Sequence, residues 1–358
     1  MPTKAKRLLW IVNHKTLVRA EVPIFRDLGY EVFIPKIIPP PLPFQSGIVT
    51  YDYDATLSIP RRDLEILNSH AFFGELDLYR PWSPTVRSII NEHFSVAVSS
   101  ISAFISPLNE AILHFDGLVL ARAFGLTRPK TYKALIDWLG RPEMIDAAAA
   151  RGSRYAFVQG YPNIAEIEPA GLVANAYTVR IAVADEFFQF ENSWVGRDGS
   201  AIMVCPGIEK DGYYRGVYQG LKRDFEGIPH KIFGKQYAKI DDGAILPYLS
   251  DSELVDLYRQ APVFIYPSTE PRHIHYSPIE AMIVGTPVLY MRGSLSDIIA
   301  GEGDMPGRCD DVVEMKQKAL RLLQGDRLLA EQIRSSQSLI VDTFRVGLAR
   351  EQWAAVLP

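Results

Sequence analysis

The sequence has few of the features that mark secreted or membrane-spanning proteins. Among its 358 residues the only cysteines are Cys205 and Cys309. Two isolated cysteines form no disulfide framework, which fits a reducing compartment. No apolar run approaches the ~20 residues of a membrane-spanning helix. The apolar run at residues 8–12 is too short for a signal peptide core. We therefore expect a cytoplasmic protein, with any membrane contact peripheral and at the inner face.

Two further absences exclude classes of function. The formal net charge is −4, so no general electrostatic attraction draws the chain to nucleic acid. No Gly-x-Gly-x-x-Gly follows any predicted strand, which argues against a nicotinamide-dependent oxidoreductase. What remains is a typical globular composition, 47% hydrophobic and 22% charged, in a chain long enough for two domains.

Strand and helix patterns alternate along the chain, which indicates a doubly wound α/β fold. Predicted strands cover residues 7–13, 30–35, 96–101, 118–123, 155–159, 179–183, 201–205, 230–233, 244–246, 263–266 and 288–291. Predicted helices cover residues 17–28, 108–114, 216–225, 310–323 and 327–344, and residues 52–82 read as loops with one helix. The pattern breaks between Asp185 and Gly199. This break predicts a first domain at 1–190, a second at 191–339, and residues 340–358 packing back on the first.

Residues 254–291 read as a helix, a buried strand, a polar loop, a second helix and a second buried strand. Ser277 and Pro278 are predicted to open the second helix, as its side-chain cap and its first residue. Glu280 has two readings at this point. It either completes a capping box with Ser277, or it belongs to a ligand site.

Polar side chains fill the loop between that strand and that helix. Glu270, Arg272, His273, His275 and Tyr276 would lie at the carboxyl end of a parallel strand, facing a helix N-terminus. Open α/β sheets bind anionic ligands at this place. The alternative is an ordinary solvated loop.

Three motifs of this segment occur in the order that characterises a known enzyme family. They are Pro267-Ser268, Glu280-Ala281-Met282 and Gly285-Thr286-Pro287-Val288. The passage resembles retaining GT-B glycosyltransferases, especially family 4. The resemblance implies the GT-B fold, in which two Rossmann-like doubly wound domains face a central cleft and the last helix crosses back to the first domain. It also implies that Glu280 contacts the nucleotide ribose, with backbone N–H groups near His275 to Ser277 against the phosphates or the sugar.

One position departs from the family pattern. The family has a glutamate near the reacting sugar, eight residues before the ribose-binding glutamate. Here that position is Arg272, and Glu270 lies two residues too early. Either the loop is longer in this chain, or the first acidic role is lost.

Two cations follow the strand at 201–205. Lys210 and Arg215 resemble the family's Arg and Lys that hold the donor diphosphate, with the residue types exchanged. Cations at a helix N-terminus neutralise a diphosphate leaving group. The alternative is a pair of solvated loop charges. Tyr248 lies where such enzymes contact the base.

The first domain is expected to supply the acceptor side. His14 directly follows the first strand, and Arg122 ends a later strand where many family members have a histidine near the transferred sugar. The alternatives are a surface histidine and an arginine paired with a helix carboxylate.

Two metal-binding patterns compete with this assignment. Asp52-Tyr53-Asp54 matches the Asp-x-Asp signature of the other large glycosyltransferase fold. His273, His275 and Glu270 could ligate zinc. Neither spacing is diagnostic, and we expect a metal-independent enzyme without a cofactor.

The sequence therefore predicts a glycosyltransferase that moves a sugar from a nucleotide-diphosphate sugar to a glycan or glycolipid acceptor in surface polysaccharide synthesis. Two alternatives stay open: a catalytically silent GT-B scaffold or sugar-binding subunit of a polysaccharide assembly complex, and a GT-B epimerase or phosphorylase.

Overall fold

The computed structural model describes residues 6–12, 14–35, 56–72, 81–127, 129–209 and 212–358. Internal contacts divide the chain into two compact units. The first comprises Met1–Ala184 and Val346–Pro358, and the second comprises Asp185–Arg345. Sequence analysis placed the corresponding limits at residues 190 and 340. Within the described residues, every helix is too short or too polar to cross a membrane.

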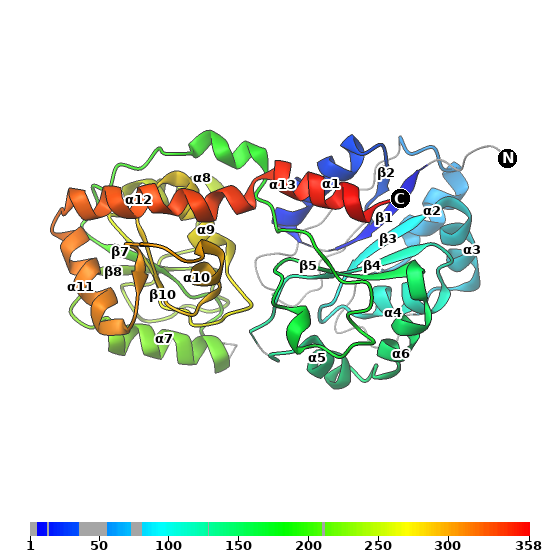
Figure 1. The fold of residues 1–358 in the computed structure, drawn as a ribbon, viewed down its shortest axis with the longest axis horizontal. Coiled ribbons are helices and arrows are strands. Elements are labelled where there is room, and N and C mark those ends of the chain that lie inside the picture. The colour runs from blue at the N-terminus through cyan, green and yellow to red at the C-terminus, as the bar shows by residue number, and fades with distance from the viewer. Residues whose placement is uncertain (1–5, 13, 36–55, 73–80, 128, 210–211) are drawn as a thin grey trace. The chain divides into compact units, whose positions relative to one another are not determined.

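The first unit is built on a parallel six-stranded sheet in the order β2-β1-β3-β4-β5-β6. Its strands are β1 (Arg7–Ile11), β2 (Glu31–Phe33), β3 (Val96–Ser100), β4 (Leu118–Ala123), β5 (Tyr155–Gln159) and β6 (Tyr177–Thr178). Its helices are α1 (Lys15–Asp27), α2 (Arg61–Ser69), α3 (Pro84–His93), α4 (Ser106–His114), α5 (Tyr132–Trp138), α6 (Glu143–Ala150) and α13 (Val346–Val356). Helices α1 and α13 cover one face of the sheet, and α4 to α6 cover the other (Figure 1).

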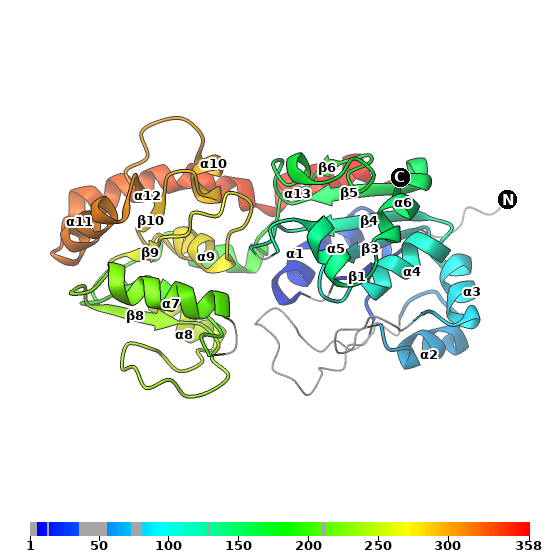
Figure 2. The same ribbon diagram turned by 90° about the horizontal axis from the view of Figure 1, so that it is seen from below.

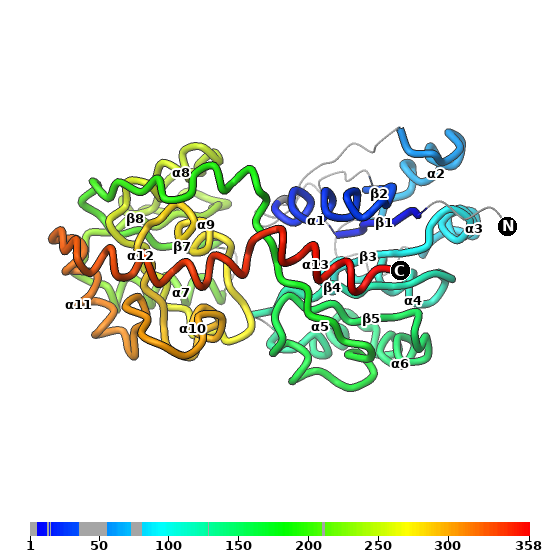
Figure 3. Tube along the Cα trace, turned by 45° about the horizontal axis from the view of Figure 1, so that its top comes forward, coloured from blue at the N-terminus to red at the C-terminus, as the bar shows by residue number. Residues whose placement is uncertain are grey.

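The end of the chain is part of the core of the first unit. Figure 3 follows the backbone from α12 (Arg327–Val341) through the short helix Asp342–Phe344 into α13. Trp353 of α13 is fully buried, and its ring lies edge-on to Phe25 of α1, with 4.9 Å between ring centroids. The hydroxyl of Tyr30 also donates a hydrogen bond to the carbonyl of Pro358 at 2.7 Å. Helix α13 is therefore held to the first unit by apolar packing and by hydrogen bonds.

The second unit has a parallel five-stranded sheet in the order β11-β10-β9-β7-β8. Its strands are β7 (Ala201–Val204), β8 (His230–Phe233), β9 (Phe264–Tyr266), β10 (Val288–Met291) and β11 (Arg308–Cys309). Besides α12, its helices are α7 (Gly212–Asp224), α8 (Asp251–Gln260), α9 (Tyr276–Val284), α10 (Leu295–Ala300) and α11 (Val312–Leu323). Helix α7 lies on one face of this sheet, and α8 and α9 lie on the other (Figures 1 and 2).

Most predicted elements are present, and three predictions are wrong in part. Residues 179–183 are not a strand, because the carbonyl of Val179 accepts from the Arg122 side chain and the N–H of Arg180 donates to the Gln352 side chain. The predicted strand at 244–246 is reduced to one bridge between Ile232 and Ile245. Helix α7 begins four residues earlier than predicted, at Gly212. The proline-rich residues 39–43 lie outside the described residues.

Candidate functional site

The topology of the second unit makes the carboxyl ends of β7 and β9 its candidate ligand site. These strands are neighbours in the sheet, with Ile202 beside Phe264. The chain leaves β7 toward β8 on one side and leaves β9 toward β10 on the other. Where two such connections diverge, they open a crevice at the carboxyl ends of the strands. We call this place the switch point of the second unit.

A tyrosine and a histidine join the two helices that start at the switch point. The hydroxyl of Tyr214, in the first turn of α7, lies 3.2 Å from Nε2 of His275, the residue before α9. The backbone N–H of His275 donates to the hydroxyl of Tyr266, at the end of β9, at 3.3 Å. The N-termini of α7 and α9 therefore converge. Because each helix N-terminus carries a partial positive charge, the pair favours a bound anion.

The predicted cap of α9 is wrong. The helix begins at Tyr276, so Ser277 is its second residue, and the N-cap residue His275 makes no side-chain cap hydrogen bond. Pro278 is accommodated at the third position, because the first-turn N–H groups have no partner within a helix. The backbone N–H groups in this turn are thus not capped by the serine that the sequence suggested.

Glu280 does not complete a capping box either. Its Oε2 accepts a hydrogen bond of 3.1 Å from the hydroxyl of Tyr258 on α8. The Ser277 side chain also hydrogen bonds to Tyr258. The structure therefore excludes the first of the two interpretations of Glu280, a capping box with Ser277. The second, a role in a ligand site, stays a prediction.

The two histidines of the loop are neutral at physiological pH. Burial lowers the pKa of His273 to about 3 and that of His275 to about 4, and the neighbouring His275 adds to the effect on His273. Their rings are nearly perpendicular, with centroids 5.1 Å apart. Neutral imidazoles offer one donor and one acceptor each, so they suit contacts with sugar hydroxyls as well as with phosphate.

The loop after β7 has a fixed shape. Gly207 has φ of +61°, which favours glycine, and a Cβ there would lie 3.4 Å from the Tyr237 ring. The Gln236 side chain holds this loop by donating to the carbonyl of Cys205 at 2.7 Å and accepting from the N–H of Ile208 at 3.1 Å. These contacts hold the backbone of residues 205–208 at this edge of the candidate site.

Of the two predicted diphosphate-binding cations, Lys210 lies outside the described residues. Arg215 is exposed on α7, and its guanidinium donates to the carbonyl of Glu209 at 2.7 Å. That bond uses one of five N–H donors, so the others stay available for phosphate oxygens.

The structure places the other predicted donor-site residues as follows. Glu270 and Arg272 are half-buried on the loop after β9, and the carbonyl of Glu270 accepts from the N–H of Leu295 at 2.9 Å. Tyr276 is half-buried at the start of α9. Tyr248 is 68% exposed on the loop before α8. The loop after β9 and the start of α9 thus lie together, whereas Tyr248 lies on a different loop.

In the first unit, Arg122 is a structural residue. It is fully buried, its Nε donates to Glu21 at 2.9 Å, and its Nη1 donates to the carbonyl of Val179 at 2.8 Å. The guanidinium also lies over the ring of Trp353, 5.3 Å from the centroid. With no exposed surface its side chain has no access to a substrate.

His14 lies between β1 and α1, at the switch point of the first unit. Its Nδ1 accepts from the N–H of Leu17 at 3.4 Å and thereby caps α1. Burial lowers its pKa to about 4. A catalytic role for His14 stays a prediction.

The metal-binding patterns gain no support. Asp52 and Asp54 lie outside the described residues. In the part of the chain that is described, no three His, Cys, Asp or Glu side chains gather as metal ligands would, and this includes the set formed by His273, His275 and Glu270.

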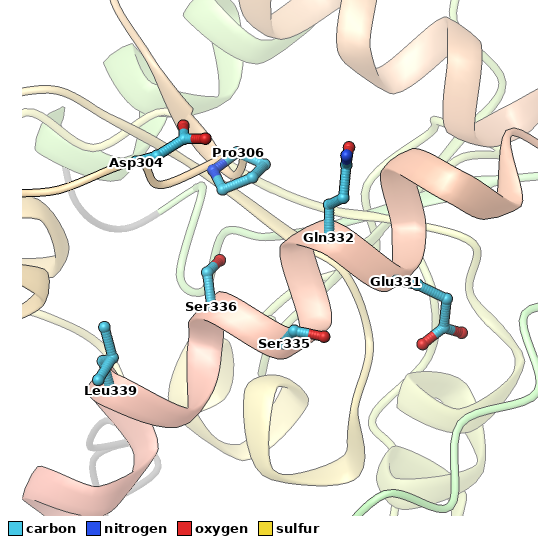
Figure 4. Close-up of a pocket in the computed structure, with 7 residues that line it drawn as sticks. All are labelled: Asp304, Pro306, Glu331, Gln332, Ser335, Ser336 and Leu339. Atoms are coloured by element: carbon cyan, nitrogen blue, oxygen red, sulfur yellow. The ribbon is translucent and has the colours of Figure 1, made fainter.

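A separate hollow of about 730 Å³ lies between the loop before β11 and helix α12 (Figure 4). Its lining residues are Asp304, Pro306, Glu331, Gln332, Ser335, Ser336 and Leu339. It lies near the start of β10, because Gln337 of α12 accepts from the N–H of Val288 at 2.7 Å. This is the amino-terminal edge of the sheet, and two carboxylates in the lining repel a diphosphate. The hollow is not the donor site.

Sequence analysis missed three tyrosines of the site: Tyr214, Tyr258 and Tyr266. In the structure Tyr258 and Val255 are both buried residues of α8. No local pattern shows that its hydroxyl meets Ser277 and Glu280, because the contact joins two helices.

Comparison with known proteins was made at the level of sequence and of structure. No protein-family model and no curated protein matches the sequence. Sucrose-phosphate synthase from Thermosynechococcus elongatus matches with a TM-score of 0.62 at 10% identity, over 98% of each chain. Alr3699/HepE from Anabaena, in complex with UDP and glucose, matches with a TM-score of 0.57 at 12% identity, over 99% of each chain.

TarM matches with a TM-score of 0.50 at 14% identity, over 73% of this chain and 54% of its own, so this chain spans about half the length of TarM. Identities this low show the fold alone. The chain has the predicted GT-B fold of two Rossmann-like domains with parallel sheets.

Proposed function

We propose that this protein is a glycosyltransferase that uses a nucleotide-diphosphate sugar, and that the switch point of the second unit binds the donor. The observation that carries the proposal is the convergence of the N-termini of α7 and α9, joined by Tyr214 and His275 at 3.2 Å. Two helix dipoles aimed at one place create positive potential for a diphosphate. Alr3699/HepE, which is similar in fold, was solved in complex with UDP and glucose, and this supports a nucleotide sugar as the donor.

Each part of the donor has proposed partners. Glu280 accepts hydrogen bonds from the ribose hydroxyls. Arg215 and Lys210 contact the diphosphate, together with the N–H groups in the first turn of α9. His273 and His275, with neutral imidazoles, contact the sugar or the adjoining phosphate, and Tyr248 contacts the base. Glu270 and Arg272 lie on the loop that would adjoin the reacting carbon.

The chemistry we propose is electrostatic. The bond between the sugar and the diphosphate breaks as positive charge develops on the sugar ring and negative charge on the leaving phosphate. Helix dipoles and cationic side chains stabilise that leaving group in place of a metal ion. We further propose retention of configuration, membership of family 4, a glycan or glycolipid acceptor and a cytoplasmic site, on the motif resemblance of residues 254–291.

The test uses a matched pair of arginines on α7. Arg215 lies at the start of the helix and Arg223 in its last turn, and both are exposed. Arg215→Ala is expected to weaken binding of UDP, GDP or ADP at least tenfold, because a lost hydrogen bond to a charged group costs roughly 1.5–3 kcal/mol. Binding of the corresponding nucleoside should change little. Arg223→Ala should leave both affinities unchanged.

Turnover is measured separately, as release of nucleoside diphosphate from a panel of nucleotide sugars with and without excess EDTA. If Arg215→Ala and Arg223→Ala lost the same amount of affinity for the nucleoside diphosphate, Arg215 would not belong to the donor site. Activity that requires added manganese or magnesium would overturn the proposal of metal independence.

The lack of a glutamate at the position of the family's first acidic residue supports a second candidate function. The protein would then be a GT-B subunit that binds nucleotide sugars without transferring them. Arg272 stands where the family has a glutamate. Binding without any slow hydrolysis of the donor, in the parent protein and in Arg272→Glu, would favour this candidate over the transferase.

A further inference from the structure

Tyr258 is a buried tyrosine of α8 whose hydroxyl contacts two residues of α9, the helix that begins at the proposed donor site. The side chain belongs to α8 and is fully buried. Its ring packs edge-on against Phe233 of β8, with 5.9 Å between centroids, and lies 6.4 Å from the ring of Phe264 of β9. Three elements of the second unit therefore fix the position of this ring.

The hydroxyl of Tyr258 lies between two polar side chains of α9. It donates to Oε2 of Glu280 at 3.1 Å, and the Ser277 side chain hydrogen bonds to it. Burial raises the pKa of Tyr258 well above its usual value, so the hydroxyl stays protonated and donates at neutral pH. The three groups form a chain of hydrogen bonds that ends on the carboxylate.

We propose that Tyr258 is a positioning residue that holds Glu280 in the orientation needed to bind the donor ribose. The inference rests on the proposed function. Glu280 is half-buried, and a carboxylate has about four lone-pair sites, so the hydrogen bond from Tyr258 does not by itself exhaust its capacity to accept. Without Tyr258 the Glu280 side chain would gain rotamer freedom, which binding must then remove.

The test is Tyr258→Phe, which removes one hydroxyl and keeps the ring that packs on Phe233 and Phe264. Affinity is measured by calorimetry for UDP, GDP and ADP and for their 2′,3′-dideoxy counterparts. We expect the variant to bind the preferred diphosphate about tenfold more weakly, the factor that corresponds to one charged hydrogen bond. The dideoxy compound lacks both ribose hydroxyls, so parent and variant should bind it equally.

Two controls separate positioning from a general loss of stability. Tyr155→Phe removes another fully buried hydroxyl, which donates to the carbonyl of Leu172 at 2.9 Å in the first unit. It should lower the melting temperature about as much as Tyr258→Phe and leave nucleotide affinity unchanged. In a Glu280→Ala background, Tyr258→Phe should have less than about a twofold effect, because coupled residues are not additive.

The outcomes distinguish this inference from the function on which it rests. If the parent binds a nucleotide and Tyr258→Phe binds it equally well, or loses ribose and dideoxyribose ligands alike, the positioning role is overturned and the donor site stands. If the parent binds none of the three diphosphates, both fail.

Discussion

At the residue scale, the histidines of the donor loop link the site to pH. Burial holds the pKa of His273 near 3 and that of His275 near 4, against about 6.5 in the unfolded chain. Between these values the unfolded state binds more protons than the folded state. The free energy of unfolding is therefore highest above about pH 6.5 and falls as the pH is lowered toward 4.

The first prediction follows from this decrease in the free energy of unfolding at low pH. The melting temperature should be flat above pH 7 and fall between pH 6.5 and 4, and His273→Gln should reduce the slope in that window. Carboxylates titrate in parent and variant alike, so the difference between the two curves isolates the histidine. Superimposable slopes would mean that His273 is accessible to protons in the folded protein.

The second prediction concerns the buried pair of Arg122 and Glu21, whose atoms are 2.9 Å apart with both side chains almost inaccessible. Arg122→Met leaves an uncompensated carboxylate in the core, so we expect unfolding to become easier by about 3–5 kcal/mol. Adding Glu21→Gln should restore part of this loss. Urea unfolding measures both effects. A variant with unchanged stability and lost transfer would make Arg122 catalytic after all.

At the element scale, strands were predicted better than helix starts. Strands β4, β5 and β8 have the bounds that the sequence pattern indicates. Apolar runs bounded by turns, typical of parallel strands, account for β4 and β5, whereas β8 begins with the polar His230 and Lys231. The strand predicted at residues 179–183 is absent, because backbone groups of this segment form hydrogen bonds with the side chains of Arg122 and Gln352. Local sequence contains no information on such distant partners.

The dipeptide Ser-Pro shows the same limit at helix starts. At α3, Ser83 caps the helix by accepting from the N–H of Val86 at 3.2 Å. At α4 and α9 the serine is inside the helix, and the N-cap residues are Ile105 and His275 respectively. In α9 the reason is a tertiary contact, since Ser277 bonds to Tyr258. The sequence thus identified Ser277 and Glu280 as important, and of its predictions for them the N-cap role of Ser277 is wrong.

The third prediction tests helix α13, whose Trp353 packs on Phe25 and Arg122 in the first unit. Trp353→Ala removes a fully buried indole and should cost about 3–5 kcal/mol. Hydrogen exchange followed by mass spectrometry should show faster exchange in β1 and β3 to β5, with β7 to β10 unchanged. Equal acceleration in both sheets would contradict the assignment of α13 to the first unit.

At the scale of the whole molecule, the alternation of strands and helices predicted the fold. The prediction of the donor site depended mainly on one segment, residues 254–291. The pattern of residues 254–291 predicted Glu270, His273 and His275 after the carboxyl end of a parallel strand, and in the structure they lie on the loop after β9. In the first unit the sequence indicated only two isolated candidate functional residues, His14 and Arg122, each placed by its position at the end of a predicted strand. One of them, Arg122, is structural, because a side chain on a central strand can point into the core as well as toward a ligand.

The central claim is that the donor nucleotide binds at the switch point of the second unit. Hydrogen exchange of the parent protein with and without its preferred nucleoside diphosphate tests it most directly. At ~100 times its dissociation constant the ligand adds ~2.7 kcal/mol of stability, enough for a clear local signal. We predict protection of residues 205–209, 212–218 and 267–284. Protection confined to the hollow at residues 301–307 and 331–339, or to the first unit, would contradict the account.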